Sequence, residues 1–273
     1  MISVNTNQGA MVALQTLNRT NSEMDKTQNA IATGLKVASA KDNGALFAIA
    51  NKMRSDVSAY DRVRESADRA ASILDTGIAA GESIMELLNE MKGKALAGSQ
   101  AGNSTSAQAA LAADFVQLRD QIASVIANAS FDGANMINAT PSAAVSLGDA
   151  AGGNTISIAG ANLSTGSTII TTIASVLTDA TTSTAALTAT NNSITALGTQ
   201  LATWGAGAKR LDVHKTFVGK LQDALNNGIG SIVDADLAKE SAKLQALQVK
   251  QQLGIQALSI ANSSSQTALS LFR

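Results

Sequence analysis

Cysteine is absent from this 273-residue chain, and proline and histidine occur once each. The lack of cysteine excludes disulfides, thiolate metal sites and cysteine nucleophiles. A single histidine excludes a pair of histidines as metal ligands. Aromatic residues make up only 3% of the chain, so few rings are present for stacking against sugars or nucleic-acid bases. Proline interrupts helices, and its near absence therefore favours long ones.

The charges are balanced, with 20 basic and 21 acidic residues. Nucleic acid is not an expected partner, because binding a duplex requires a clustered surplus of Lys and Arg. Membrane insertion is not expected either, since no apolar run approaches the roughly 20 residues that span a bilayer. The first basic residue is Arg19 and no apolar segment follows it. We therefore expect no cleaved secretory signal.

Four segments carry apolar residues at alternating steps of three and four. They run from Ala10 to Leu35, from Val57 to Leu88, from Leu111 to Ala129 and from Ile194 to Ile232. This spacing keeps one stripe turned toward a partner helix and is typical of coiled coils. A helix from Val57 to Leu88 is about 45–50 Å long. The sequence thus predicts a mainly α fold, a long coiled-coil helical hairpin rod.

The final segment predicts a further helix, with Asp234 as its N-cap. Its apolar residues fall on two stripes. One contains Leu237, Leu244, Leu247, Leu258 and Ala261, and the other contains Ala246, Val249, Leu253, Ala257 and Ile260. A helix that is apolar on two faces is expected to be covered from two sides.

Two stretches break the helical pattern. Residues 38–45 (ASAKDNGA) predict a hinge. The segment that begins at Asn138 is rich in Ala, Gly, Ser and Thr, and its β-branched runs Thr155–Ile158 and Thr168–Thr172 predict a small exposed β-hairpin. We expect an inner domain (1–41 plus 233–273), an outer domain (42–137 plus 190–232) and a short exposed insert of the outer domain (138–189).

Both ends of the chain are apolar on more faces than one pair of helices can cover. We therefore expect them to become ordered when neighbouring copies of the chain cover them, which makes the chain a subunit that polymerises into a helical tube. The residues expected to pack and polymerise in the inner domain are Leu14, Leu17, Met24, Ile31, Leu35, Leu237, Leu244, Leu247, Val249, Leu253, Leu258, Ile260, Leu271 and Phe272. Those expected to pack in the outer domain are Val57, Leu74, Ile78, Leu88, Leu118, Ile122, Leu201, Leu211, Val218 and Leu225.

Several stretches carry a family resemblance. They are MISVNTN at the start, IATGLKVASAKDNGALFAIANKMRSDV (31–57), ESADRAASI (65–73), SFDGANMI (130–137) and the ending VDADLAKESAKLQALQVKQQLGIQALSIANSSSQTALSLFR (233–273). With them the chain resembles bacterial flagellin over roughly residues 1–138 and 190–273, and KGKALAGSQ (92–100) is similar to the alphaproteobacterial type.

The resemblance implies a structural subunit of the extracellular flagellar filament, the propeller of swimming bacteria. It implies an inner terminal-helix domain that lines a channel, an outer domain that forms the tube wall and an insert that faces solvent. The implied partners are other flagellin subunits, the flagellar export apparatus, an export chaperone, the filament cap and the hook-junction proteins. Export would proceed without a cleaved signal peptide. Neither enzymatic activity nor a cofactor is implied.

The resemblance also implies two surface features. The counterpart of the motif that an innate immune receptor recognises in some flagellins is Asn89, Glu90, Met91, Lys92, Gly93, Lys94, Ala95 and Leu96. Glu90 stands where the motif has Arg, and Gly93-Lys94 replaces Glu-Leu, so we expect weak receptor activation. Sites of possible O-glycosylation, with a plain solvated loop as the equal alternative, are Thr165, Ser167, Thr168, Thr171, Thr172, Thr181 and Thr182.

The remaining features are interpreted as structural. We expect His214 to be a helix surface residue, and Gly205-Ala206-Gly207 to allow close packing, because no strand precedes it as a dinucleotide motif requires. Arg64, Lys215 and Gln222 interrupt the apolar stripes, and either set the register of the rod or switch contacts between subunits. The alternatives to a flagellin are a hook–filament junction protein and a cytoplasmic coiled-coil scaffold or helical toxin. The ending ALSLFR favours flagellin.

Overall fold

A computed structural model describes residues 7–171 and 177–270, with side chains described up to Ser263. This part of the chain is mainly helical, with one small antiparallel sheet, as the sequence predicted. Its elements in order are α1 (Gln8–Thr33), α2 (Gly44–Gly98), α3 (Thr105–Asn128), β1 (Ala144–Leu147), β2 (Thr155–Ile158), α4 (Ala180–Val233) and α5 (Leu237–Ser270). Three residues selected from the sequence, Thr172, Leu271 and Phe272, lie outside the described residues.

The chain divides into two compact units. The terminal unit comprises Met1–Ser55 and Asp223–Arg273, and the central unit comprises Asp56–Gln222. The expected inner and outer domains divide instead at residues 41 and 233, so the terminal unit takes in the start of α2 and the end of α4. The three-part domain scheme stays a prediction.

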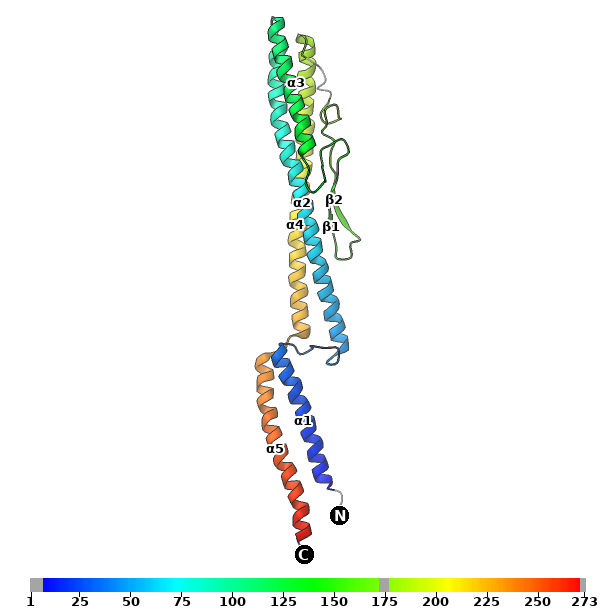
Figure 1. Ribbon diagram of the computed structural model, residues 1–273, viewed down its shortest axis with the longest axis vertical. Coiled ribbons are helices and arrows are strands. Elements are labelled where there is room, and N and C mark those ends of the chain that lie inside the picture. Colours follow the sequence, from blue (N-terminus) through cyan, green and yellow to red (C-terminus); the bar gives the residue numbers. More distant parts are fainter. Residues whose placement is uncertain (1–6, 172–176, 271–273) are drawn as a thin grey trace. The chain divides into compact units, whose positions relative to one another are not determined.

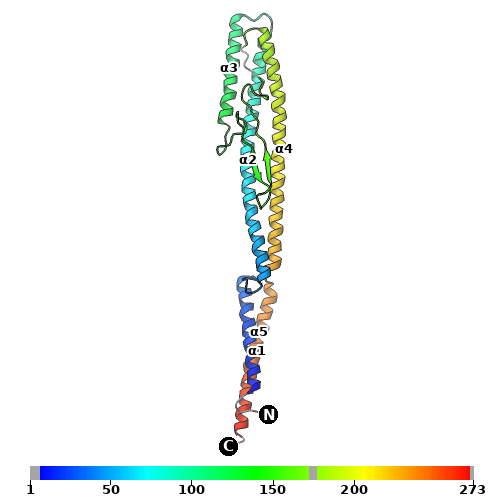
Figure 2. The same cartoon turned by 90° about the vertical axis from the view of Figure 1, so that its right-hand side faces the viewer.

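In the terminal unit, α1 and α5 lie side by side and antiparallel (Figures 1 and 2). The side chain of Gln251 donates a hydrogen bond of 2.8 Å to Asn21 at the middle of the pair. Near the chain ends, the side chain of Asn7 donates to the carbonyl of Ala261 at 2.7 Å. Gly254 lets the helices approach closely, because a Cβ atom there would meet Cδ1 of Leu17 at 3.3 Å.

The segment between α1 and α2 is held against the start of α5. Helix α1 ends at Gly34, whose φ of 71° is the left-handed conformation that glycine adopts freely. The carbonyl of Gly34 accepts from the backbone N–H of Ala235, and the N–H of Lys36 donates to Val233. These bonds hold the connecting segment, residues 34–43, against the chain that leads into α5; the predicted hinge, residues 38–45, overlaps this segment and the first two residues of α2.

Helix α5 begins at Leu237, two residues later than an N-cap at Asp234 would place it. The side chain of Asp236 accepts hydrogen bonds from the backbone N–H groups of Ala238 and Lys239, as an N-cap does. Asp234 instead forms an isolated bridge with Leu35. The prediction of Asp234 as the N-cap was wrong, because its backbone is engaged by the segment after α1.

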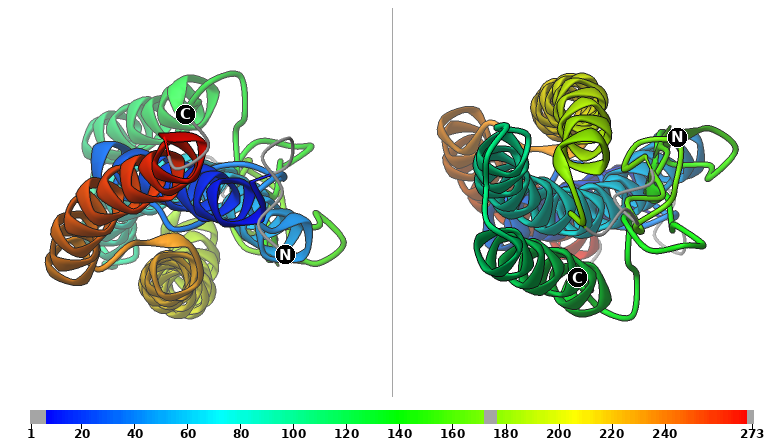
Figure 3. Two further views of the ribbon diagram at one scale, coloured as in Figure 1. Left: turned by 90° about the horizontal axis from the view of Figure 1, so that it is seen from below. Right: turned by 90° about the horizontal axis from the view of Figure 1, so that it is seen from above.

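The central unit has its core among α2, α3, α4 and the strand region, and Figure 3 shows the three helices end-on with the strand region to one side. Trp204 is fully buried, and its indole N–H donates to the carbonyl of Ala159 at 3.0 Å. Gly81 of α2 lies directly against Leu201 and Trp204 of α4. The other large side chains that are fully buried are Phe115, Leu74, Ile84, Leu88, Met91, Ile122, Met136, Ile137, Leu163 and Ile170.

The sheet pairs β1 with β2, with Ala144 opposite Ile158 and Leu147 opposite Thr155. The predicted strand at Thr155–Ile158 is therefore confirmed. The second predicted strand was wrong in its described part: residues 168–170 form bends, and Thr171 belongs to no strand. The reason is local, since Ile170 is fully buried and its N–H donates to the hydroxyl of Ser167 in a turn.

Helix α4 begins at Ala180, ten residues before the boundary expected from the sequence. Asp179 stands at its start, and its carboxylate accepts from the backbone N–H of Thr182 at 2.8 Å. This contact satisfies an N–H of the first turn that has no partner within the helix. Residues 180–189 are consequently helical and do not belong to the loop of the insert.

Candidate functional site

The two apolar stripes of α5 differ sharply in burial. On the stripe that faces α1, Leu247 is only 3% exposed, and Leu244, Leu258 and Ala261 are half-buried, although Leu237 at the helix start is exposed. The outer stripe of α5, which we define as Ala246, Val249, Leu253, Ala257 and Ile260, is exposed along its whole length. Exposure reaches 56% at Val249, 59% at Leu253 and 69% at Ile260.

Helix α1 covers its apolar residues only in part. Leu17, Met24 and Ile31 are half-buried, as is Leu35 just beyond the helix, while Leu14 is exposed. Beside Leu14, Met11 and Val12 are also exposed. The buried residues of α1 are threonines, Thr20 and Thr27. The terminal pair therefore presents apolar surface on both helices, an arrangement that marks an interaction site.

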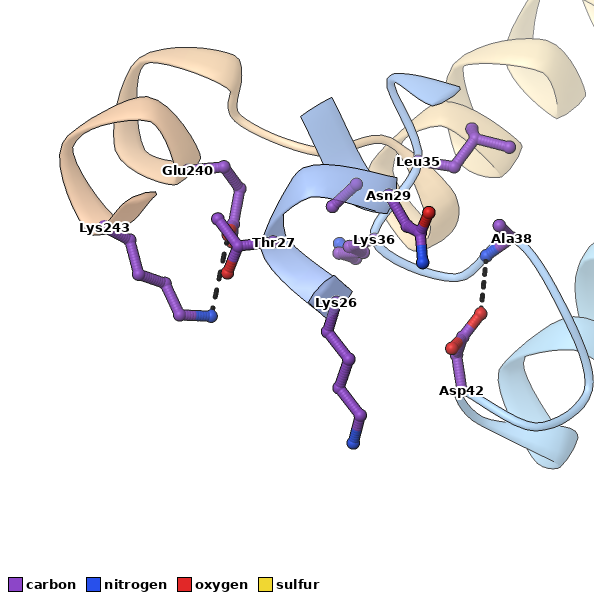
Figure 4. Close-up of a pocket in the computed structure, with 10 residues that line it drawn as sticks. Lys26, Thr27, Asn29, Leu35, Lys36, Ala38, Asp42, Glu240 and Lys243 are labelled. Carbon is purple, nitrogen blue, oxygen red and sulfur yellow. Dashed lines mark hydrogen bonds and ion pairs between the residues drawn. The ribbon is translucent and has the colours of Figure 1, made fainter. Parts of the chain in front are cut away.

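A hollow of about 250 Å³ lies where α1, the 34–43 segment and α5 meet (Figure 4). Its charged groups hold the fold together. Lys243 forms an ion pair with Glu240, and the side chain of Lys36 donates to the carbonyl of Ser231. Lys26 extends away from both carboxylates that line the hollow. The hydroxyl of Thr27 is buried there without a hydrogen-bond partner.

Asp42, at the edge of this hollow, closes a turn. Its carboxylate accepts from the backbone N–H and hydroxyl of Ser39 and from the N–H of Ala38. These bonds favour the ionised form and lower the pKa of Asp42 below its ordinary value. The carboxylate of Asp42 thus stabilises the turn. Within residues 7–171 and 177–270, no cluster of acidic residues and histidine could hold a metal ion.

The residues selected for packing of the outer domain divide into two groups. Leu74, Leu88, Ile122, Leu211 and Val218 are buried. Val57, Ile78, Leu118, Leu201 and Leu225 are half-buried. The structure places Leu225 in the terminal unit and the other nine in the central unit.

Polar residues that interrupt the stripes link α2 to α4. Gln222 is buried and donates to the carboxylate of Asp61 at 2.8 Å and to the carbonyl of Val57 at 3.3 Å. Arg64 donates to the side-chain oxygen of Gln222, and Lys215 forms an ion pair with Asp68. These contacts favour the register-setting interpretation over the switching one, because each polar group finds its partner within the chain.

His214 differs from its predicted surface position. It is half-buried, and its Nε2 atom is buried without a hydrogen-bond partner. At Gly207, the predicted close packing is present: a Cβ atom would lie 2.9 Å from Cδ1 of Ile158. At Gly205 nothing lies within 4 Å. Of this glycine pair, only Gly207 is required by packing.

The counterpart of the receptor motif lies on α2 and is only partly accessible. Met91 and Ala95 are fully buried, and Lys94 is half-buried in an ion pair with Asp114. The exposed members are Asn89, Glu90, Lys92, Gly93 and Leu96. Weak receptor activation stays a prediction.

Among the residues selected for O-glycosylation, hydrogen bonding separates two groups. Thr171 donates to the carbonyl of Ala189, and the hydroxyl of Thr182 joins the cap formed by Asp179. The hydroxyl of Ser167 accepts from a backbone N–H. The exposed threonines are Thr165, Thr168 and Thr181. Attachment of sugars stays a prediction, and among the described candidates these three are the exposed positions.

None of the helices in the described part of the chain is long and apolar enough to cross a membrane. The bacterial flagellin N-terminal helical region matches residues 4–142, and the bacterial flagellin C-terminal helical region matches residues 187–272.

Relatives that match along the whole chain are flagellins too. The flagellin FljK of Caulobacter vibrioides is 48% identical, over 99% of this chain and 98% of its own. A flagellin of Brucella melitensis is 39% identical over the full length of both chains. Both are similar to this chain across its ends and its centre.

Solved structures share the fold at lower identity. The crystal structure of a Bacillus cereus flagellin has a TM-score of 0.51 at 23% identity and covers 56% of this chain and 88% of that one. A putative flagellar hook-associated protein from Vibrio parahaemolyticus has a TM-score of 0.60 at 13% identity, over 71% of this chain and all of that one. These two show the fold alone. The matched terminal regions and the full-length relatives establish that the chain belongs to the bacterial flagellin family.

Proposed function

We propose that copies of this chain build the flagellar filament by covering the outer stripe of α5 and the exposed end of α1. As a flagellin, the chain is a structural subunit of that filament and polymerises with other flagellin subunits. The hook–filament junction alternative is not favoured, because the relatives that are 39–48% identical over the whole chain are flagellins.

The observation that carries the proposal is the exposure of the outer stripe. Val249, Leu253 and Ile260 are more than half exposed, although a soluble surface normally carries charge at such positions. Burying a large aliphatic side chain contributes about 1.5–3 kcal/mol. Contact with a neighbouring copy along this stripe therefore supplies several such contributions per subunit.

The test introduces charge on the stripe. The double variant Val249→Asp, Leu253→Asp places two carboxylates in the proposed contact, and we expect it not to sediment as polymer under conditions in which the wild-type chain does. The matched control, Ser241→Asp with Gln248→Asp, adds the same charge at exposed positions of α5 away from the outer stripe. Polymerisation of the stripe variant at wild-type concentration would refute the proposal.

The remaining assignments are also proposals. The chain acts without catalysis or cofactor, since the polar side chains described above cap helices or set the register between α2 and α4. It leaves the cell through the flagellar export apparatus without a cleaved signal, meets an export chaperone, the filament cap and hook-junction proteins, and binds neither nucleic acid nor membrane. Family membership supports the export route. Appearance of the chain in the culture medium of a strain lacking the export apparatus would contradict it.

A further inference from the structure

Four carboxylates lie on one exposed face of α2. Asp75, Glu82, Glu86 and Glu90 are seven or four residues apart, which puts them on the same side of a helix. All four are exposed, and none takes part in an ion pair among the described residues. Residues 70–91 contain neither Lys nor Arg. This acidic face of α2 is therefore uncompensated along its own helix.

A face of opposite character lies on α4. Val213 is 61% and Phe217 58% exposed, four residues apart and outside the stripe that forms the core. Lys209 and Lys220 flank them, are exposed, and form no ion pair with described side chains. This basic face of α4, defined by these four residues, combines apolar surface with two free cations.

The two faces match in spacing. Asp75 and Glu86 are eleven residues apart, and so are Lys209 and Lys220. Eleven residues make about three helical turns and a rise of roughly 16 Å, so each pair of charges stands on one side of its helix at the same separation. Two helices packed side by side, in either direction, would bring both cations opposite both carboxylates.

A hollow beside Asp75 provides room for an aromatic ring. It has a volume of about 320 Å³ and lies between α2 and α4, with Ala67, Ala71 and Ala208 among its lining residues. Small side chains leave space that a ring from outside can fill. Lys209 of the same chain also lines the hollow, without an ion pair to Asp75.

We propose that the acidic face of α2 in one subunit binds the basic face of α4 in a second copy, with Phe217 covered at the contact. This inference rests on the proposed function, since it names a contact between flagellin subunits in the central unit. The two faces are different surfaces of one chain. Such a contact is heterologous, and repeating it from copy to copy generates an open helical chain when the rotation between copies does not close into a ring.

Charge reversal tests the pairing. The variant Lys209→Glu, Lys220→Glu makes both faces acidic, and the variant Asp75→Lys, Glu86→Lys makes both basic. Each alone should raise the critical concentration for polymerisation roughly tenfold, as expected when two exposed ion pairs become repulsive. An equimolar mixture should recover wild-type polymerisation, because each acidic face then meets a basic face on the other variant. Circular dichroism confirms that both variants fold.

The controls separate this inference from the proposed function. Phe217→Ser should also raise the critical concentration, without changing the charge. If either charge variant polymerises as the wild type does, or if the mixture is no better than its components, the pairing is refuted while the contact through α5 stands. If instead the outer-stripe variant of α5 polymerises normally, the proposed function is refuted whatever the charge variants do.

Discussion

The terminal helix pair and the central unit contain similar apolar side chains but bury them to very different degrees. In the central unit, Trp204, Phe115 and Leu88 are fully buried within one chain. In the pair of α1 and α5, only one face of α5 is covered, and Leu253 and Ile260 remain more than half exposed. The difference lies in the number of layers: three helices and a strand region enclose a core, whereas two helices cannot. The core of the central unit is therefore covered within one chain, whereas the outer stripe of α5 is left exposed.

Hydrogen exchange should show the largest difference between the two regions. In dilute, unpolymerised subunit, we expect backbone amides of α5 between Leu244 and Ile260 to exchange on the order of a thousandfold faster than those of α2 between Val63 and Leu88. Amides in helices with few buried contacts open locally, while core amides exchange with global unfolding. Mass spectrometry after timed deuteration measures both. Equal protection of the two helices would contradict the expected difference between the terminal pair and the central unit.

Truncation of single side chains should show the same contrast in stability. Trp204→Ala removes a fully buried ring and its hydrogen bond to Ala159, and should lower the free energy of unfolding by about 3–5 kcal/mol. Leu253→Ala removes an exposed side chain and should change it by less than about 0.5 kcal/mol in the monomer. Denaturant unfolding of unpolymerised protein provides both values. A large loss at Leu253 would mean that the outer stripe is covered within the chain.

Close packing in the strand region can be tested by adding one methyl group. A Cβ atom on Gly160 would lie 2.6 Å from the carbonyl oxygen of Met136 and 2.8 Å from Cβ of Pro141. We expect Gly160→Ala to destabilise the central unit by about 1–3 kcal/mol, the range for overpacking. The control is Gly93→Ala in α2, where nothing lies within 4 Å. It should stabilise the helix by about 0.5–1 kcal/mol, and a loss of stability there would show that the surface of α2 at Gly93 is covered.

Apolar spacing predicted the helices well, because repeats of three and four residues report the side of a helix that packs. It also separated the two stripes of α5, which proved to differ in burial. It failed where local hydrogen bonding decides, as at Asp236, which caps α5 in place of Asp234. It failed again at residues 168–171. There a β-branched run predicted a strand, but the chain bends and buries Ile170.

The exposed pair Val213 and Phe217 escaped the sequence analysis for a related reason. Both lie within the long repeat of α4, and a search for the core stripe passes over apolar residues that stand off it. The feature of the sequence that could have identified this pair is the spacing of four residues between Val213 and Phe217, with Lys209 and Lys220 on either side. Burial of a side chain in the folded chain is what distinguishes such a surface from the core, and spacing alone does not give it.

The smallest predicted effect is one in which the two regions should not differ. Asp42 in the terminal unit and Asp179 in the central unit both have a lowered pKa, and the chief cause in each is a hydrogen bond from the backbone, from Ser39 and from Thr182 respectively. Because the folded pKa is below the ordinary value of 3.8, each bond contributes stability above that pH and loses it as the pH falls through the folded pKa.

Titration followed by nuclear magnetic resonance at the amides of Ser39 and Thr182 should therefore give midpoints below 3.8 at both sites, and the replacements Asp42→Asn and Asp179→Asn should remove the transition at their own site only. A midpoint at the ordinary value for Asp42 alone would show that its turn is open in the free subunit. The incomplete burial of the terminal pair would then extend to the segment that joins α1 to α2. Ordinary midpoints at both sites would instead refute the local hydrogen bonds themselves, whatever the state of the neighbouring core.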